Sequence, residues 1–165
     1  MVKMILGWMG VFFLGFVLQS AFLFHVAVFG VQPDLLFIAL FVFAIQFGPL
    51  AATYIGFALG LSQDLFAPAI LGQNALAQTI SGFFMGLFNE RVMRTDAMLK
   101  TIVVFVAFLL HDAIFLIVTI VKTDGTWGVL FMDLLCKTVP RAIYSMLFLS
   151  LVYIWEYFFK PHSAR

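Results

Sequence analysis

An acidic residue near the end of an apolar, glycine-containing segment constrains the fold of this chain most strongly. The stretch GFALGLSQDLFAPAILGQNAL, residues 56–76, carries Gly56 and Gly60 four positions apart and Asp64 four positions further along. A carboxylate that faces hydrocarbon costs roughly 2.5 kcal/mol or more, so we expect Asp64 to face protein or water. Small residues four apart let a neighbouring helix backbone come close. The stretch therefore predicts a membrane helix with a packing face and a buried polar group.

The composition of the whole chain is typical of a protein embedded in lipid. Of its 165 residues, 64% are hydrophobic and 10% are charged, whereas a soluble domain has about 25% charged residues. The formal net charge is +1 and the largest basic cluster is Arg91, Arg94 and Lys100, so we expect no nucleic-acid binding. Cys136 is the only cysteine, which excludes an internal disulfide and a CxxC metal site.

Six apolar segments predict a single all-α domain over residues 1–165, an integral membrane bundle of six transmembrane helices. A span needs about 20 apolar residues, and fewer where protein shields one end. The predicted helices cover residues 4–24, 33–47, 49–66, 74–88, 101–121 and 140–159. Pro33 is predicted at the first position of the second helix, where its missing N–H costs nothing.

Residues 127–138 are predicted to form an amphipathic helix in the membrane interface, with one longer last helix as the alternative. Asp133 and Lys137 lie four apart in the favourable acid-before-base order, and the other side of this segment is apolar. With six spans both chain ends lie on one side, together with most of the basic residues. The positive-inside rule then predicts that both termini are cytoplasmic.

Two series of residues spaced four apart predict that helices 49–66 and 74–88 pack face to face. The helices are antiparallel neighbours because the turn between them is short. Their glycines then meet in mid-membrane, and Asp64 meets Asn74 or Gln78 at the outer end. Gly72 is assigned to the turn and grouped with the packing glycines. The packing glycines are Gly56, Gly60, Gly72, Gly82 and Gly86.

Two roles are open for Asp64. It can accept hydrogen bonds from the backbone N–H groups at the start of the next helix, as a structural clamp on the turn. Alternatively, it lies in a polar pocket that is open to the outer face and binds a partner or a small ligand.

His111 and Asp112 lie near the middle of the fifth predicted helix, where ionisable residues are candidates for function. Adjacent residues point about 100° apart on a helix, so we expect that the two do not share one face. A satisfied interior hydrogen bond is one interpretation, and a proton-coupled carrier is the other. Arg141 is expected to pair with Asp133 or to extend outward to the interface.

No arrangement in the sequence points to catalysis or to a metal. The three histidines lie in different regions, and we find neither a nucleophile with a nearby base nor a phosphate loop nor a HExxH pair. We therefore expect no enzyme activity, no metal site and no cofactor.

Four motifs between Pro33 and Leu76 resemble the MreD family, the rod shape-determining membrane proteins of bacteria. They are Pro33-Asp34-Leu35, Gly48-Pro49-Leu50, GFALGLSQDL and LGQNAL. The resemblance implies a multi-pass protein of the bacterial inner membrane, with a fold similar to the substrate-binding subunits of energy-coupling-factor vitamin transporters. It also adds Pro33 and Asp34 to Asp64, Asn74 and Gln78 as the candidate polar site. The family often shows a proline and then a Tyr-Asn pair near the start of its last helix; here Pro140 and Tyr144 are followed by Ser145.

The function implied by this resemblance is a non-enzymatic scaffold for lateral wall synthesis. Its direct partner would be MreC, a single-span periplasmic protein, and its indirect partners MreB, RodA and a class B penicillin-binding transpeptidase. We expect a lipid-buried groove for the partner's helix, with the turn 64–74 and the segment 127–138 positioning the partner's periplasmic part. The alternative is a vitamin-binding subunit of a transporter, which needs a polar outward pocket; its candidate residues are Gln63, Asp64, Asn74 and Gln78.

Overall fold

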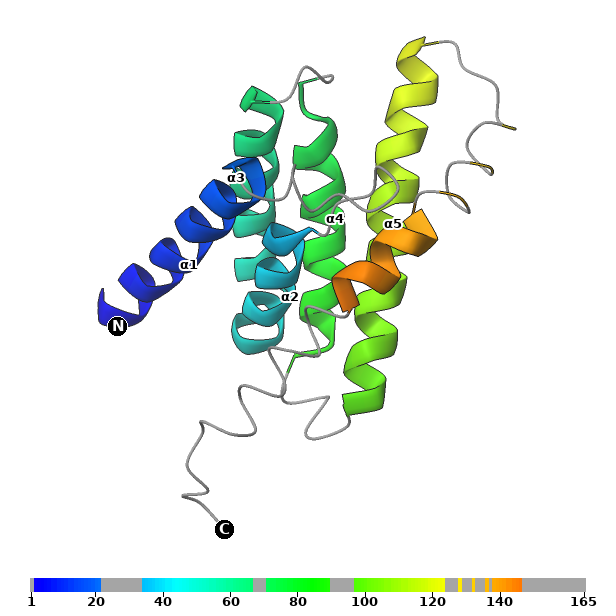
Figure 1. Ribbon diagram of the computed structural model, residues 1–165. Coiled ribbons are helices and arrows are strands. Elements are labelled where there is room, and N and C mark those ends of the chain that lie inside the picture. Colours follow the sequence, from blue (N-terminus) through cyan, green and yellow to red (C-terminus); the bar gives the residue numbers. More distant parts are fainter. Residues whose placement is uncertain are drawn as a thin grey trace.

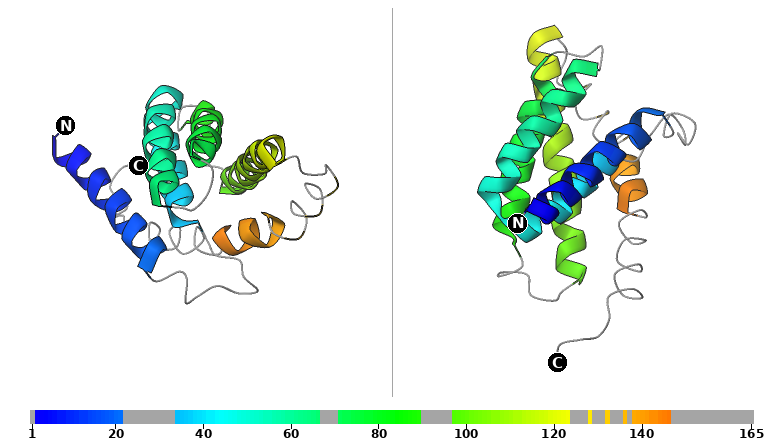
Figure 2. Two further views of the ribbon diagram at one scale, coloured as in Figure 1. Left: turned by 90° about the horizontal axis from the view of Figure 1, so that it is seen from above. Right: turned by 90° about the vertical axis from the view of Figure 1, so that its left-hand side faces the viewer.

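The computed structural model describes residues 2–21, 34–66, 71–89, 97–123 and 138–146, together with residues 128, 132 and 136. This described part is helical and contains no strand. Its five helices are α1 (Val2–Ala21), α2 (Leu35–Phe47), α3 (Pro49–Phe66), α4 (Gln73–Leu87) and α5 (Ala97–Thr123). Residues 139–146 form a further short helical segment. Helices α3, α4 and α5 stand side by side (Figure 1), whereas α1 leans away from them toward its N-terminal end (Figure 2).

The helix boundaries agree with the sequence-based prediction to within a few residues at most ends. Helix α3 has the predicted bounds, because Gly48 ends α2 with a φ of 84° and Pro49 begins the next helix. The predicted start of α2 at Pro33 is wrong. Its first residue is Leu35, and Asp34 is the N-cap, whose carboxylate accepts a hydrogen bond from the Phe37 N–H at 2.9 Å.

Three predictions fall largely on residues outside those described. The assignment of Pro33 to the candidate polar site is one of them. The interfacial helix over 127–138 is another, since only a few of its residues are described, among them Cys136, whose side chain is exposed. The last helix is the third, because its description ends at residue 146.

Helix α2 occupies the centre of the bundle. It packs against α1, α3 and α4, and eight of its 13 residues are buried. A helix that is apolar on all sides belongs in the interior. Its 13 residues rise only about 20 Å, so α2 could span the hydrocarbon core only where neighbouring protein shields one end. Aromatic contacts tie it to its neighbours: Phe37 lies 4.5 Å from Phe108 of α5, and Phe43 lies 5.2 Å from Trp8 of α1, measured between ring centroids.

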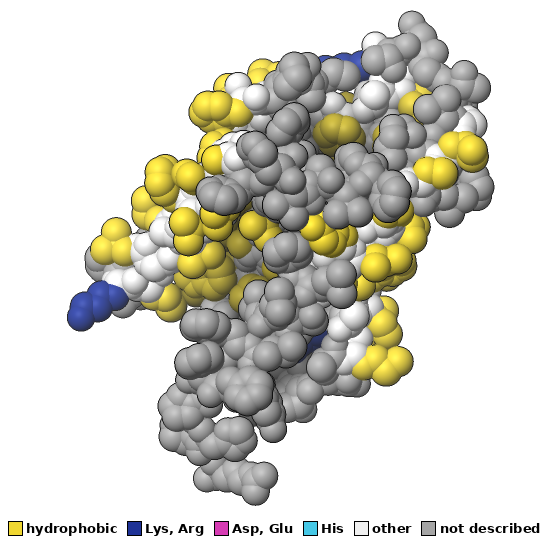
Figure 3. Space-filling view, in the orientation of Figure 1, with side chains coloured by type: hydrophobic (Ala, Val, Ile, Leu, Met, Phe, Trp, Pro, Cys, Tyr) yellow, Lys and Arg dark blue, Asp and Glu magenta, His cyan; other side chains and the backbone are white. Residues whose placement is uncertain are grey.

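Within the described residues, one segment is long and apolar enough to cross a membrane by itself, Met98–Lys122 of α5. Shorter apolar segments occur at Leu6–Ala21 and Leu35–Phe47. Large hydrophobic side chains are exposed on α1, α3, α4 and α5, and yellow patches on the visible surface of Figure 3 mark part of this apolar exterior. So much exposed apolar surface fits contact with lipid or with other membrane helices. The bundle of six spans stays a prediction.

Candidate functional site

The backbones of α3 and α4 touch at the glycines of the two predicted stripes. A Cβ atom built on Gly60 would lie 2.5 Å from the Cα of Ala75, and one on Gly56 would lie 2.5 Å from the carbonyl oxygen of Gln78. Gly82 approaches the backbone of Ala52 in the same way, and Gly86 approaches that of Pro49. The predicted face-to-face packing is therefore present, and a side chain at any of these four positions would push the helices apart.

Gly72 does not belong to this packing set, and its assignment there is wrong. A Cβ atom on Gly72 would meet nothing within 4 Å, but the residue has a φ of +93°. Its role is the left-handed backbone conformation directly before α4, which glycine adopts without steric cost.

Asp64 clamps the start of α4 from the end of α3. One carboxylate oxygen accepts hydrogen bonds from the N–H groups of Gly72 at 2.9 Å and Ala75 at 3.0 Å. The other accepts from the backbone N–H of Asn74 at 3.0 Å and from its side-chain amide at 2.9 Å. Gly72 offers no side-chain cap, so Asp64 supplies the acceptors that the first turn of a helix needs. Of the two roles that the sequence left open for Asp64, the structure shows the first, a structural clamp on the turn.

The hydrogen bonds within the turn occupy both carboxylate oxygens of Asp64. Four donors occupy its two oxygens, about the full number that a carboxylate can accept. Gln78 does not take part, which corrects the alternative contact predicted for it. Its side-chain amide donates instead to Gln63 at 2.6 Å.

Replacing Asp64 by Asn is expected to lower the free energy of unfolding by about 2–3 kcal/mol. The new NH₂ group faces backbone donors, and charge-assisted hydrogen bonds are lost. Thermal unfolding of the detergent-purified protein measures the change. Ser62→Ala is the matched control, since among the described residues the Ser62 hydroxyl bonds only the Leu59 carbonyl of its own helix. Equal stability of the two variants would contradict the clamp.

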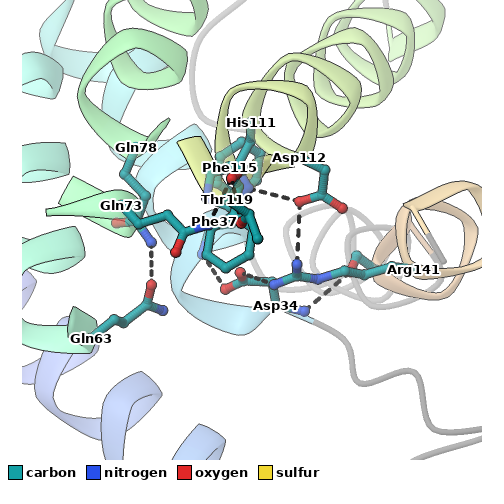
Figure 4. A network of polar contacts seen from close by, with 11 residues as sticks. Asp34, Phe37, Gln63, Gln73, Gln78, His111, Asp112, Phe115, Thr119 and Arg141 are labelled. Atoms are coloured by element: carbon teal, nitrogen blue, oxygen red, sulfur yellow. Dashed lines mark hydrogen bonds and ion pairs between the residues drawn. The ribbon is translucent and has the colours of Figure 1, made fainter. Parts of the chain in front are cut away.

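A second polar site joins three elements through Arg141. One guanidinium nitrogen lies 2.6 Å from Asp34 at the start of α2, and another lies 3.2 Å from Asp112 in the middle of α5. The same Asp112 oxygen lies 2.8 Å from Nδ1 of His111 (Figure 4). The side chains of Asp34 and His111 are 2% exposed, whereas that of Arg141 is 30% exposed. We call these four residues the charge cluster.

The charge cluster corrects two predictions. His111 and Asp112 do contact each other although adjacent residues point about 100° apart on a helix, and the predicted interior hydrogen bond is confirmed between them. Arg141 does not extend outward; it pairs with Asp34 and Asp112. Asp133, its predicted partner, lies outside the described residues.

Further polar groups surround the cluster, and the sequence analysis did not assign them to it. The Ser145 hydroxyl accepts a hydrogen bond from the Asp34 backbone N–H at 3.1 Å, and Thr138 hydrogen-bonds Asp112. Gln73 of α4 donates to the Phe115 carbonyl at 2.7 Å and to the Thr119 hydroxyl. The sequence could have placed Asp34, because an aspartate directly before an apolar run is typical of a helix N-cap. This pattern predicts Asp34 at the start of a buried helix.

Both polar sites lie in the range that matches a known family. The model of rod shape-determining protein MreD matches residues 2–160. The chain belongs to the MreD family. This family implies a role in rod shape determination and a place in a bacterial membrane, and it is known as a shape-determining structural family. Comparisons with curated proteins and with solved structures find no match.

Proposed function

We propose that this protein is a scaffold of the bacterial inner membrane that binds MreC and helps position the peptidoglycan synthases of the cell-elongation machinery. The family match over residues 2–160 is the observation that carries the proposal. MreB, RodA and a class B penicillin-binding transpeptidase are the indirect partners. The chain crosses the membrane six times and has both termini in the cytoplasm.

The outer face of α3 is the surface that we propose for the partner's transmembrane helix. Four large side chains spaced along this face are exposed: Leu50, Tyr54, Phe57 and Leu65, with Tyr54 75% exposed. Another face of α3 is fixed on α4 by the glycines and by Asp64. A surface that is already fixed loses little conformational freedom on binding. Transmembrane helices associate mainly by packing and hydrogen bonds, and the Tyr54 hydroxyl can donate such a bond.

The described contacts favour the scaffold over the vitamin-binding alternative. The four residues suggested for an outward pocket bond one another: Asp64 accepts from Asn74, and Gln78 donates to Gln63. A ligand would have to compete with these bonds for the same donors and acceptors. Asp64 therefore supports partner binding indirectly, by holding the turn.

Depletion of the protein in its native rod-shaped host tests the function. We expect the rods to round up as the protein is lost, and the wild-type gene to restore them. Cells that keep their rod shape but acquire a vitamin requirement would contradict the scaffold and support the transport alternative.

A further inference from the structure

We propose that the partner's transmembrane helix packs along α3 as a left-handed helical pair, in contact with a seam of five residues. The seam residues are Ala51, Tyr54, Ala58, Leu61 and Leu65. The inference rests on the proposed function, because it takes the outer face of α3 as the partner's binding surface. It adds the residues in contact, the crossing of the two helices and the shape of the partner's helix.

The spacing of the seam residues sets the crossing of the two helices. The residues follow one another at intervals of three, four, three and four positions, a mean of 3.5. Helices whose contact residues repeat every 3.5 positions cross at about +20° and interlock their side chains as knobs in holes. The face toward α4 has a constant interval of four, and its buried residues are Ala52, Gly56, Gly60 and Asp64. The two faces of α3 therefore suit different neighbours, and the seam fits a left-handed pair.

The seam lies on the side of α3 that is opposite to α4. Tyr54 comes two positions before Gly56 and Ala58 two positions after it, so each points about 160° away from Gly56. The backbone of Gly56 touches α4, where a Cβ atom would lie 2.5 Å from the Gln78 carbonyl oxygen. On the other side, Tyr54 is 75% and Leu65 is 68% exposed, and Ala58 is exposed too. A helix can reach this side, since α3 stands at one end of the row that it forms with α4 and α5 (Figure 2).

The two alanines give the seam a shape that a helix can fill. Ala51 and Ala58 lie seven positions apart, at equivalent places in the repeat, and the larger Tyr54 and Leu61 follow them. A methyl group between larger side chains leaves a hole, which a large side chain of a neighbouring helix can enter. Small residues also let the two backbones come close, which increases van der Waals contact in lipid. The partner's helix therefore carries large apolar side chains opposite both alanines.

The exposed stripe of α4 differs from the seam in this respect. Every exposed residue of α4 is large and apolar: Leu76, Ile80, Phe83 and Leu87. Lipid tails are as apolar as leucine, and such a stripe needs no more than contact with them. Holes that alternate with large side chains instead match a neighbour whose own side chains are fixed in space. This difference favours a helix over lipid as the occupant of the seam on α3.

Filling one hole tests the seam. Ala58→Leu places a large side chain where the partner's side chain should enter, so co-purification with tagged MreC should fall about tenfold. Ala58→Ser keeps the small size and should retain the complex, and Val106→Phe, which enlarges an exposed side chain of α5, should leave the recovery within about twofold. Ala58 is exposed, so the unfolding temperature of the isolated Ala58→Leu variant should not change. Full recovery of MreC with Ala58→Leu would overturn the seam, whereas failure of the wild-type chain to recover MreC would contradict the proposed function itself.

Photo-cross-linking tests the seam without depending on the folding of Ala58→Leu. A benzophenone amino acid replaces Tyr54 or Leu65 on the seam, or Ile80 or Phe83 on α4, all of which are exposed. Irradiation of intact cells should join the two seam positions to MreC and the two α4 positions to lipid only. Cross-links from the seam to lipid only, or equal cross-linking of MreC from α3 and α4, would overturn the proposal.

Discussion

Replacing Arg141 by Met is expected to cause the largest loss of stability of any single substitution considered for this protein. The change leaves Asp34 and Asp112 buried without their counter-ion, and removal of one partner from a buried ion pair typically costs 3–5 kcal/mol. Since whole domains are stable by only about 5–15 kcal/mol, this loss is a large share of the stability and should clearly lower the unfolding temperature. The measurement is the yield of monodisperse protein in detergent together with its unfolding temperature.

Two comparisons show whether the lost ion pairs are the cause. Lys122→Met removes an exposed cation in the last turn of α5 and should change the stability by no more than about 0.5 kcal/mol. The triple variant Asp34→Asn/Asp112→Asn/Arg141→Met removes all three charges and should recover part of the stability, because no buried charge is left unpaired. A single Arg141→Met variant as stable as Lys122→Met would contradict the charge cluster.

The second large effect is expected for Gly60→Ala. Its new methyl group would lie 2.5 Å from the backbone of Ala75 and Asn74, which cannot move aside without separating α3 from α4. Overpacking of this kind costs about 1–3 kcal/mol, and denaturant or thermal unfolding in detergent measures the loss.

Gly7→Ala is the matched control for that substitution. Gly7 lies on α1, where a Cβ atom would meet nothing within 4 Å. Alanine is the better helix former, so Gly7→Ala should leave the stability unchanged or raise it by about 0.5–1 kcal/mol. The same response of both variants would mean that helix propensity, not close packing, governs Gly60.

The α3–α4 hairpin is the part of the fold that could be predicted from the sequence. Its determinants are local: glycines recur every fourth residue, the turn is short, and Asp64 and Asn74 lie only ten positions apart. The antiparallel geometry of such a pair follows from these features alone. The role of Gly72 was misassigned, because four-residue spacing does not reveal the φ angle of a residue in a turn.

The charge cluster could not be predicted in the same way. Asp34 and Arg141 are 107 positions apart. A single charged residue in an apolar segment forms no repeating pattern, so the sequence does not indicate which residue it pairs with. The predicted interior hydrogen bond of His111 and Asp112 is present, but the contact between the two side chains was not predicted, because only the directions of adjacent residues on a helix were considered. The side chains of the charge cluster come together only when α2, α5 and the segment 139–146 pack against one another.

The two polar sites stabilise different parts of the bundle. Asp64 holds α3 to α4, whereas Arg141 holds the segment 139–146 to α2 and α5. Helix α2 contacts α3 and α4 and so connects the two sites. The exposed outer face of α3 belongs to neither site, and substitutions there should alter partner binding without unfolding the protein.

Co-purification with tagged MreC from detergent-solubilised membranes tests the proposed binding surface most directly. Tyr54→Ala and Phe57→Ala, which truncate exposed side chains of α3, should each lower the recovery of the complex, by about tenfold if they contribute as interface hot spots do. Ile102→Ala and Val106→Ala truncate exposed side chains of α5 and should leave the recovery within about twofold, since they are away from the proposed contact. Equal recovery of MreC with all four variants would contradict binding at the outer face of α3.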